Sequence, residues 1–322
     1  MSRYVKISAI GVEPMQINAD AGKRGCGGGS ASDIWNRMKD ILITQIEQVL
    51  PDRPDLIVLP EMCDTPSFGD TGAAAAYIDG RGDANVRLFS SIAKENNCNI
   101  AFSTIRRGKG DYFINSACVL NRSGGVAGWY DKNHLPISEM TKNVRCGTGA
   151  ELIELDFGKV ACAICFDLNY TGLMQRYADQ KPDLIIFMSM FHGALLQQIW
   201  AHLCKSYFVG AISNSRPSAI LSPMGDTLAY STNYRNFATA SVNLDYAFAH
   251  YDFNFEKFKL LKAYYGGGVT LFDPGNIGYV MISSETAGVS AGIMLEKFQI
   301  EPLDAYLERS LSMHMDAAYR DV

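Results

Sequence analysis

Residues 159–170 have the sequence KVACAICFDLNY, in which a short apolar run ends on a cysteine. The run from Val160 to Ile164 predicts a buried strand, and the polar turn after Cys165 leads into a predicted helix near Gly172. A cysteine at a strand end is held rigidly and stays open to a small molecule, as a nucleophile must be. Taken alone, Cys165 is still better explained by packing, because free cysteine is among the most buried residue types.

The composition is that of an ordinary globular protein. The formal net charge is −5 and no stretch is rich in Lys and Arg, which argues against a nucleic-acid or membrane-surface partner. The first residues, MSRYVKISAIGVEP, predict a strand and not a signal peptide, and no stretch has the length of a transmembrane helix. Eight cysteines in such a chain predict reduced thiols in a cytoplasmic protein.

Two motifs fit packing or loop roles better than binding sites. Cys162 and Cys165 form a C-x-x-C pair, but a three-residue offset in a strand directs them to opposite faces, so we expect neither a metal nor a dithiol site. The glycine-rich residues 21–33, AGKRGCGGGSASD, lack the G-K-[ST] ending of a phosphate loop. They predict a flexible loop, or alternatively a mobile rim over a site, before a helix capped by Ser32 or Asp33.

Two further predicted strands end on residues that can carry chemistry. Residues 54–62, PDLIVLPEM, contain an unbroken apolar run, which predicts a strand covered on both faces. Glu61 follows this run, where an apolar surrounding can raise its pKa as a general base requires. Lys132 follows the predicted strand Val126–Tyr130, although a lysine at a strand end is most often solvated. Residues 182–190, PDLIIFMSM, match 54–62 at five of nine positions, which hints at two related halves.

The order of elements predicts the fold class. Predicted strands and helices alternate with frequent hairpins, so we expect an α/β layered sandwich with mixed sheets. From about residue 250 the pattern loosens, and a helix over Leu303–Met313 is the last clear element. We expect one main domain over residues 1–285 and a C-terminal extension, 286–322, which lacks its own core and packs on the body or on a second subunit.

Glu61, Lys132 and Cys165 follow three separate predicted strands. Strand ends in layered α/β proteins meet at a common edge, where sites form. A carboxylate can accept the thiol proton, while an ammonium lowers the thiol pKa and stabilises an oxyanion. Such a set can attack a carbonyl or nitrile carbon, form a thioester and hydrolyse it.

The segments around these residues resemble the three signatures of the nitrilase (carbon-nitrogen hydrolase) superfamily. They are LPEM at Glu61, WYDKNHL at Lys132 and AICFD at Cys165, in the family's order and with its wide spacing. LPISE, which contains Glu139, and SPMGDTLA, residues 222–229, resemble further segments of the family. The resemblance covers roughly residues 4–250.

The resemblance implies an α-β-β-α sandwich that dimerises through its outer helices, with residues 1–285 as the carbon-nitrogen hydrolase domain. It implies that Cys165 is the nucleophile, that Glu61 is the general base and acid, and that Lys132 stabilises the oxyanion together with the backbone N–H of Phe166. Glu139 would position Lys132 or the substrate. Neither a metal nor an organic cofactor is implied, and the expected partners are a small amide or carbamoyl substrate and further copies of the chain.

The chain departs from the family pattern on either side of the expected nucleophile. Asp131 stands where the family often has Arg, and residues 168–172, LNYTG, replace a common Arg-Phe-Pro-Glu continuation. Without basic residues after the cysteine, a carboxylate-bearing substrate is less expected, unless Arg216 or a partner's arginine supplies the charge. Phe166, Phe68 and His192 are weaker candidates for substrate binding. A histidine after a strand end more often caps a loop or helix.

Several functions remain open at this point. The favoured one is an amidase acting on a small linear amide or an N-carbamoyl compound. A true nitrilase and a catalytically silent binding or scaffold member of the superfamily are the alternatives. A Cys-His hydrolase that uses His134 or His192 is a further possibility, but it leaves Glu61 and Lys132 without a role.

Overall fold

The computed structural model describes residues 3–13, 15–17, 29–68, 71–213 and 217–319. The chain forms two compact units, one of Val5–Ser241 and the other of Met1–Tyr4 with Val242–Val322. The first unit contains Glu61, Lys132 and Cys165 and the other residues that the sequence nominates for a site.

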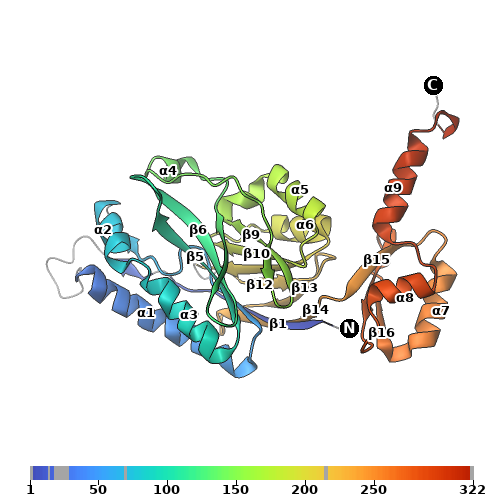
Figure 1. Cartoon of the computed structure of the whole chain (residues 1–322), viewed down its shortest axis with the longest axis horizontal. Helices are drawn as coiled ribbons and strands as arrows, with labels where there is room; N and C mark the ends of the chain where they lie inside the picture. The colour runs from blue at the N-terminus through green and yellow to red at the C-terminus, as the bar shows by residue number, and fades with distance from the viewer. Residues whose placement is uncertain (1–2, 14, 18–28, 69–70, 214–216, 320–322) are drawn as a thin grey trace. The chain divides into compact units, whose positions relative to one another are not determined.

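The first unit is built on two six-stranded mixed sheets (Figure 1). In the first sheet, the three parallel strands β1, β3 and β5 adjoin the antiparallel pair β6 and β7. The strand order is β14 (Phe237–Asn243), β1 (Tyr4–Ile10), β3 (Leu56–Val58), β5 (Asn99–Arg107), β6 (Phe113–Leu120) and β7 (Val126–Asp131).

The second sheet repeats this plan. Its parallel strands β9, β10 and β11 are flanked by antiparallel neighbours on both sides. The strand order is β13 (Thr227–Tyr230), β12 (Ala219–Leu221), β11 (Tyr207–Ile212), β10 (Leu184–Ser189), β9 (Gly158–Ile164) and β8 (Ile153–Leu155). The two similar stretches 54–62 and 182–190 thus contribute β3 and β10, which each lie between two parallel neighbours.

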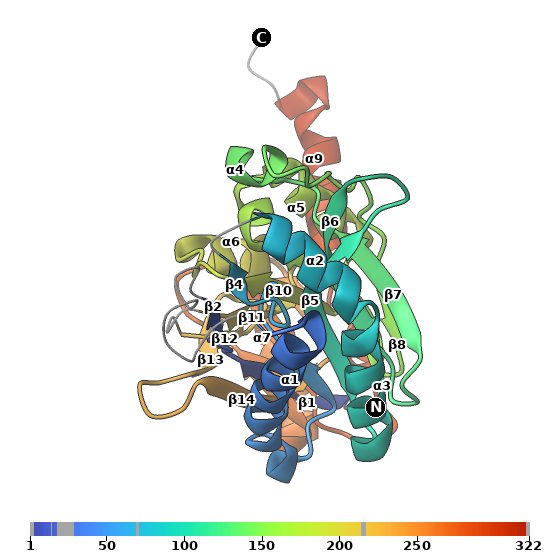
Figure 2. The same ribbon diagram turned by 90° about the vertical axis from the view of Figure 1, so that its left-hand side faces the viewer.

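Helices cover the outer faces of the two sheets, which pack against each other through β5 with β10 and β6 with β9 (Figure 1 and Figure 2). The helices α1 (Ala31–Glu47) and α3 (Ala84–Asn96) lie on the first sheet, and α5 (Thr171–Gln180) and α6 (Leu195–Cys204) lie on the second. Along β5, Ile100 and Phe102 pack in the core with the helices. Ala101, which lies between them, faces the other sheet because side chains alternate along a strand. This arrangement confirms the expected α-β-β-α sandwich.

The start of α1 corrects one sequence expectation. Its N-cap is Ser30, whose Oγ accepts a hydrogen bond from the Asp33 N–H in a capping box. Ser32 and Asp33, the predicted caps, lie in the first turn instead. Three neighbouring polar residues can each cap a helix, and the backbone conformation of Ser30 selects among them. Residues 21–28 of the glycine-rich stretch lie outside the described residues.

The second unit has its own hydrophobic core, in which Met294, Leu295 and Ile300 of the expected extension 286–322 are buried. A three-stranded sheet in the order β15 (Tyr246–His250), β17 (Tyr279–Ser284) and β16 (Val269–Phe272) packs with α7 (Phe255–Tyr265), α8 (Ala291–Lys297) and α9 (Leu303–His314). Leu261, Ile282 and Met294 are completely buried in its core cluster. The boundary expected at residue 285 therefore falls inside this unit, because short strands and aromatic residues hide its periodicity from the sequence.

Among the described residues, none of the helices is both long and apolar enough to cross a membrane.

Candidate active site

Glu61 follows the C-terminal end of β3, which lies between β1 and β5 in the first sheet. The chain continues in extended form through Leu59, whose N–H donates to the Ala101 carbonyl, and Glu61 is then buried with 3% of its surface exposed. Met62 adopts a φ of +50°, a left-handed conformation that is costly for a side chain with a Cβ. Its N–H donates to Ser103 Oγ at 3.2 Å, which holds the sharp turn in place.

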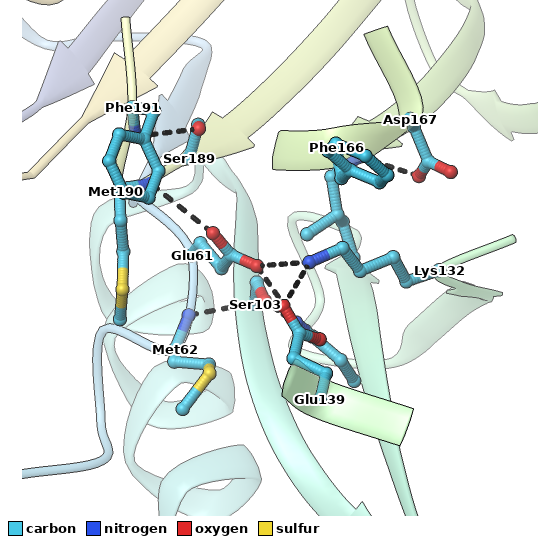
Figure 3. Close-up of polar contacts among 12 residues, drawn as sticks. Glu61, Met62, Ser103, Lys132, Glu139, Phe166, Asp167, Ser189, Met190 and Phe191 are labelled. Atoms are coloured by element: carbon cyan, nitrogen blue, oxygen red, sulfur yellow. Dashed lines mark hydrogen bonds and ion pairs between the residues drawn. The ribbon is translucent and has the colours of Figure 1, made fainter. Parts of the chain in front are cut away.

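Lys132 lies between two carboxylates (Figure 3). Its Nζ is 2.8 Å from Glu61 Oε1 and 2.7 Å from Glu139 Oε1, and the side chain is fully buried. Burial alone disfavours the ammonium, but the charges of Glu61 and then Glu139 outweigh it, so the pKa of Lys132 is raised. Burial in turn raises the pKa of Glu139 against the opposing effect of Lys132. The lysine therefore stays cationic at neutral pH.

Two residues that the sequence does not single out orient the Glu61 carboxylate. Asn115 Nδ2 donates to Oε1 at 2.9 Å. The backbone N–H of Met190 donates to Oε2 at 3.2 Å (Figure 3). Ser103 Oγ donates to Asn115 Oδ1 at 3.0 Å and so fixes the amide. The only signal in the sequence is that Ser103 and Asn115 are polar residues within apolar strands, where a buried polar group needs a partner.

Cys165 begins a short 3-10 helix directly after β9 and has a φ of +46°. Ile164 pairs with Met188 across the sheet, which brings Cys165 beside Ser189 at the end of β10. Glu61, Lys132 and Ser189 all lie close enough to the thiol to influence its pKa. Burial and the Glu61 charge raise the thiol pKa to about 12, against the opposing effects of Lys132 and Ser189.

Asp167 ties the turn after Cys165 to the segment that contains Lys132. Its buried carboxylate accepts hydrogen bonds from Ile164 N at 2.9 Å and from the Tyr130 hydroxyl at 2.7 Å. The backbone N–H of His134 donates to the other oxygen at 2.9 Å, and His134 Nδ1 lies at the same distance from it. His134 also stacks on Tyr170 at a centroid distance of 3.8 Å, and it is not among the described residues that line the cavity at Cys165.

A cavity of about 580 Å³ opens onto the cluster. Glu61, Glu139 and Cys165 line it, and so does Phe68, which the sequence nominates for the pocket. Phe191, which the sequence analysis missed, lines it as well.

The other pocket candidates lie elsewhere. His192 is absent from the cavity wall, because its Nδ1 accepts a hydrogen bond from Ala194 N at 3.1 Å near the start of α6. The Phe166 side chain also lies off the wall and packs edge-on against Tyr170 at a centroid distance of 5.6 Å. Arg216 lies outside the described residues.

Cys162 is buried within β9, and burial raises its pKa to about 12. No group of three or more His, Cys, Asp or Glu side chains is arranged to hold a metal ion in the part of the chain that the structure describes. Cys162 therefore packs in the core.

The family model for carbon-nitrogen hydrolases matches residues 25–249. The chain belongs to the carbon-nitrogen hydrolase family. This confirms the resemblance found in the sequence. The match ends near the boundary between the two compact units, at Ser241 and Val242.

Curated members of the family are distant relatives of this carbon-nitrogen hydrolase. A chloroplastic omega-amidase of Arabidopsis thaliana is 25% identical over 63% of the chain and 62% of its own length. A beta-ureidopropionase of the same plant is 26% identical over 43% of the chain and 36% of its own length. The chain thus spans less than two thirds of these two relatives. An omega-amidase of Xenopus laevis is 23% identical over 62% of the chain and 81% of its own length.

Solved structures of carbon-nitrogen hydrolases share the fold. The enzyme from Helicobacter pylori G27 has a TM-score of 0.62 at 16% identity and covers 76% of this chain and 90% of its own. Nit3 of Saccharomyces cerevisiae, a member of the nitrilase superfamily, has a TM-score of 0.60 at 17% identity and covers 76% of this chain and 91% of its own. At these identities the similarity establishes the architecture alone.

Proposed function

We propose that this carbon-nitrogen hydrolase cleaves a small linear amide or N-carbamoyl compound through a thioester on Cys165, with Glu61, Lys132 and Cys165 as its triad. The observation that carries the proposal is the cluster in which Lys132 contacts Glu61 and Glu139 at 2.8 and 2.7 Å, while Cys165 lines the same cavity as both carboxylates. Relatives named omega-amidase and beta-ureidopropionase support amides and N-carbamoyl compounds as substrates.

In the first half of the proposed reaction, the Cys165 thiol transfers its proton to Glu61 while the sulfur attacks the carbonyl carbon. A thiol with a pKa near 12 needs this base, since it is neutral at pH 7. Lys132 has three N–H donors, of which two serve the carboxylates, and the third stabilises the oxyanion. The Phe166 N–H assists from the first turn of a 3-10 helix, where backbone donors lack helical partners.

The C–N bond then breaks as Glu61 returns the proton to the leaving nitrogen, which departs as ammonia or an amine. In the second half, Glu61 takes a proton from water, and the hydroxide attacks the thioester carbon. The C–S bond breaks, the acid is released, and the sulfur regains its proton from Glu61. Glu139 is the positioning residue for Lys132, because it shares the ammonium with Glu61.

The test is a panel of primary amides, N-carbamoyl compounds and nitriles, with ammonia release as the readout and mass spectrometry for a trapped acyl adduct. We expect turnover of amides or carbamoyl compounds and an adduct on Cys165. Cys165→Ala should abolish both. Cys146→Ala is the matched control, because this cysteine is exposed and lies off the cavity, and it should retain full activity.

Three outcomes contradict the proposal. Activity that survives Cys165→Ala rules out the thioester. Turnover confined to nitriles identifies a nitrilase. Two relatives whose names include nitrilase support this alternative. A folded protein that neither turns over nor forms an adduct with any compound is a silent member of the family.

A further inference from the structure

Beyond the catalytic cluster, the cavity beside Cys165 is lined mostly by apolar side chains, and its polar lining residues are Gln16, Thr65, Ser67, Thr71, Ser138 and Lys142. Its walls come from the segment after β3, from β4 (Ser67–Phe68), from α2 (Thr71–Arg81), from the start of β6 and from the end of β10. The apolar side chains that face it include Phe68, Ala74, Ala75, Ile78, Phe113 and Phe191. A volume of about 580 Å³ is typical of pockets that enclose a small organic molecule.

Charge is scarce in this wall. Apart from Glu61 and Glu139, Lys142 is the one charged side chain among the described residues that line the cavity, and it is solvent-exposed. Lys132, behind the wall, already shares its charge with two carboxylates. A second carboxylate on a bound substrate would therefore lose its hydration without gaining a buried cation. An uncharged hydrocarbon chain would instead gain binding energy as it leaves water.

Two neighbouring alanines on α2 make room for such a chain. Ala74 and Ala75 are both half-buried at the cavity, and the next residue, Ala76, is exposed to solvent. Phe68 packs on Tyr77 at a centroid distance of 5.4 Å, and the Tyr77 hydroxyl donates to the Asp64 carbonyl at 2.7 Å. The aromatic wall is thus anchored to the buried interior, while small side chains leave space beside it.

We propose that the cavity receives the uncharged, apolar acyl group of the substrate, and that Ala74 and Ala75 set the length of the chain it accepts. This inference rests on the proposed amidase function and assigns its substrate class. It distinguishes aliphatic and aryl amides from monoamides of dicarboxylic acids.

The first test compares acetamide, hexanamide and adipamate, the last of which matches hexanamide except for a carboxylate in place of its terminal methyl group. We expect kcat/KM to rise roughly four-fold with each added methylene until the cavity is filled. Adipamate should be at least about ten-fold poorer than hexanamide. Adipamate turnover equal to or faster than that of hexanamide would overturn the inference, and its loss in Lys142→Gln would identify Lys142 as the cation that binds the carboxylate.

A matched pair of variants tests the role of α2. Ala75→Leu fills the cavity and should lower kcat/KM for hexanamide roughly ten-fold or more, while acetamide changes less than about two-fold. Ala76→Leu makes the same change on the exposed side of the helix and should leave both substrates unaffected. Equal losses for the short and long amides, or no loss for either, contradict the assignment.

A binding measurement separates this inference from the proposed reaction. Saturation-transfer NMR on Cys165→Ala should detect hexanamide in preference to adipamate, and Ala75→Leu in that background should weaken the hexanamide signal. If this preference appears without turnover of any amide by the native protein, the proposed reaction fails and the cavity assignment holds. Binding of adipamate in preference to hexanamide overturns the assignment whatever the turnover.

Discussion

Cys165, the proposed nucleophile, lies in a position that makes its thiol weakly acidic. Its burial at the end of β9 and the neighbouring Glu61 charge hold the pKa near 12, well above that of a free cysteine. Glu61, which raises the thiol pKa through its charge, is also the base that the proposed reaction assigns to the thiol proton. The site therefore contains a neutral thiol beside a base in place of a preformed thiolate.

The pH dependence of Cys165 alkylation follows from this raised pKa. Below a pKa of about 12 the thiolate fraction grows about ten-fold per pH unit, so the rate with iodoacetamide should rise from pH 7 to pH 10 without levelling. Peptide-resolved mass spectrometry measures the rate at Cys165 separately from the other cysteines. A plateau near neutral pH would show a stable thiolate and contradict the prediction.

Glu61→Gln provides the control for the cause of the shift. Loss of the Glu61 charge removes one of the two main influences that raise the thiol pKa, so the variant should be alkylated faster than the native protein at pH 8. Its amide turnover should nevertheless be lost, because the base is gone.

At the scale of elements, a buried ion pair joins the turn after β3 to α2 and β5. Asp64 and Arg81 pair with 0% and 2% of their side chains exposed, and Arg81 also donates to the Ile105 carbonyl at 2.8 Å. Asn85 Nδ2 and the Thr104 hydroxyl donate to the same Asp64 oxygen at 2.6 and 2.8 Å. This network holds together three segments that line the cavity.

Asp64→Asn should destabilise the protein by about 3–5 kcal/mol, because it leaves the Arg81 charge buried without its partner. The double variant Asp64→Leu/Arg81→Met should recover most of that loss, since it removes both charges. Urea unfolding midpoints measure the effect. Asp83→Asn breaks the exposed pair with Arg87 and is the control that should barely move the midpoint. A double variant as unstable as Asp64→Asn would show that the charges are not the cause.

At the scale of the whole molecule, the open question is assembly. The family resemblance predicts a homodimer through the outer helices. Among the helices that cover the two sheets, α6 exposes two leucines, Leu195 at 63% and Leu203 at 50%, while its opposite face buries Trp200. Two exposed leucines on a covering helix fit a contact between copies.

We therefore expect the native chain to sediment as a dimer and Leu203→Glu to sediment as a monomer, because the substitution places a charge in an apolar contact. Leu260→Glu on α7, a substitution of an equally exposed leucine in the other compact unit, should leave the dimer intact. Sedimentation velocity distinguishes the two states. A monomeric native protein, or a Leu203→Glu variant that stays dimeric, contradicts this interface.

The sequence alone predicted the layered fold, and it predicted that Glu61, Lys132 and Cys165 follow the ends of strands. This worked because β3 and β10 are short strands buried on both faces, so their apolar runs are unbroken and their ends are marked by polar residues. The sequence missed α2, whose row of alanines shows little contrast between faces, and it missed the core of the second unit, whose strands are short.

What only the tertiary structure decided is which groups meet at the site. Strand register and the packing of one sheet on the other bring Asn115 and the Met190 N–H to Glu61, and Ser189 to Cys165. Both register and packing depend on residues far apart in the chain. His192 does not line the cavity. Its Nδ1 accepts a hydrogen bond from Ala194 N near the start of α6 instead. Local pattern places a side chain at a strand end, whereas the direction it faces and its neighbours depend on contacts between distant segments.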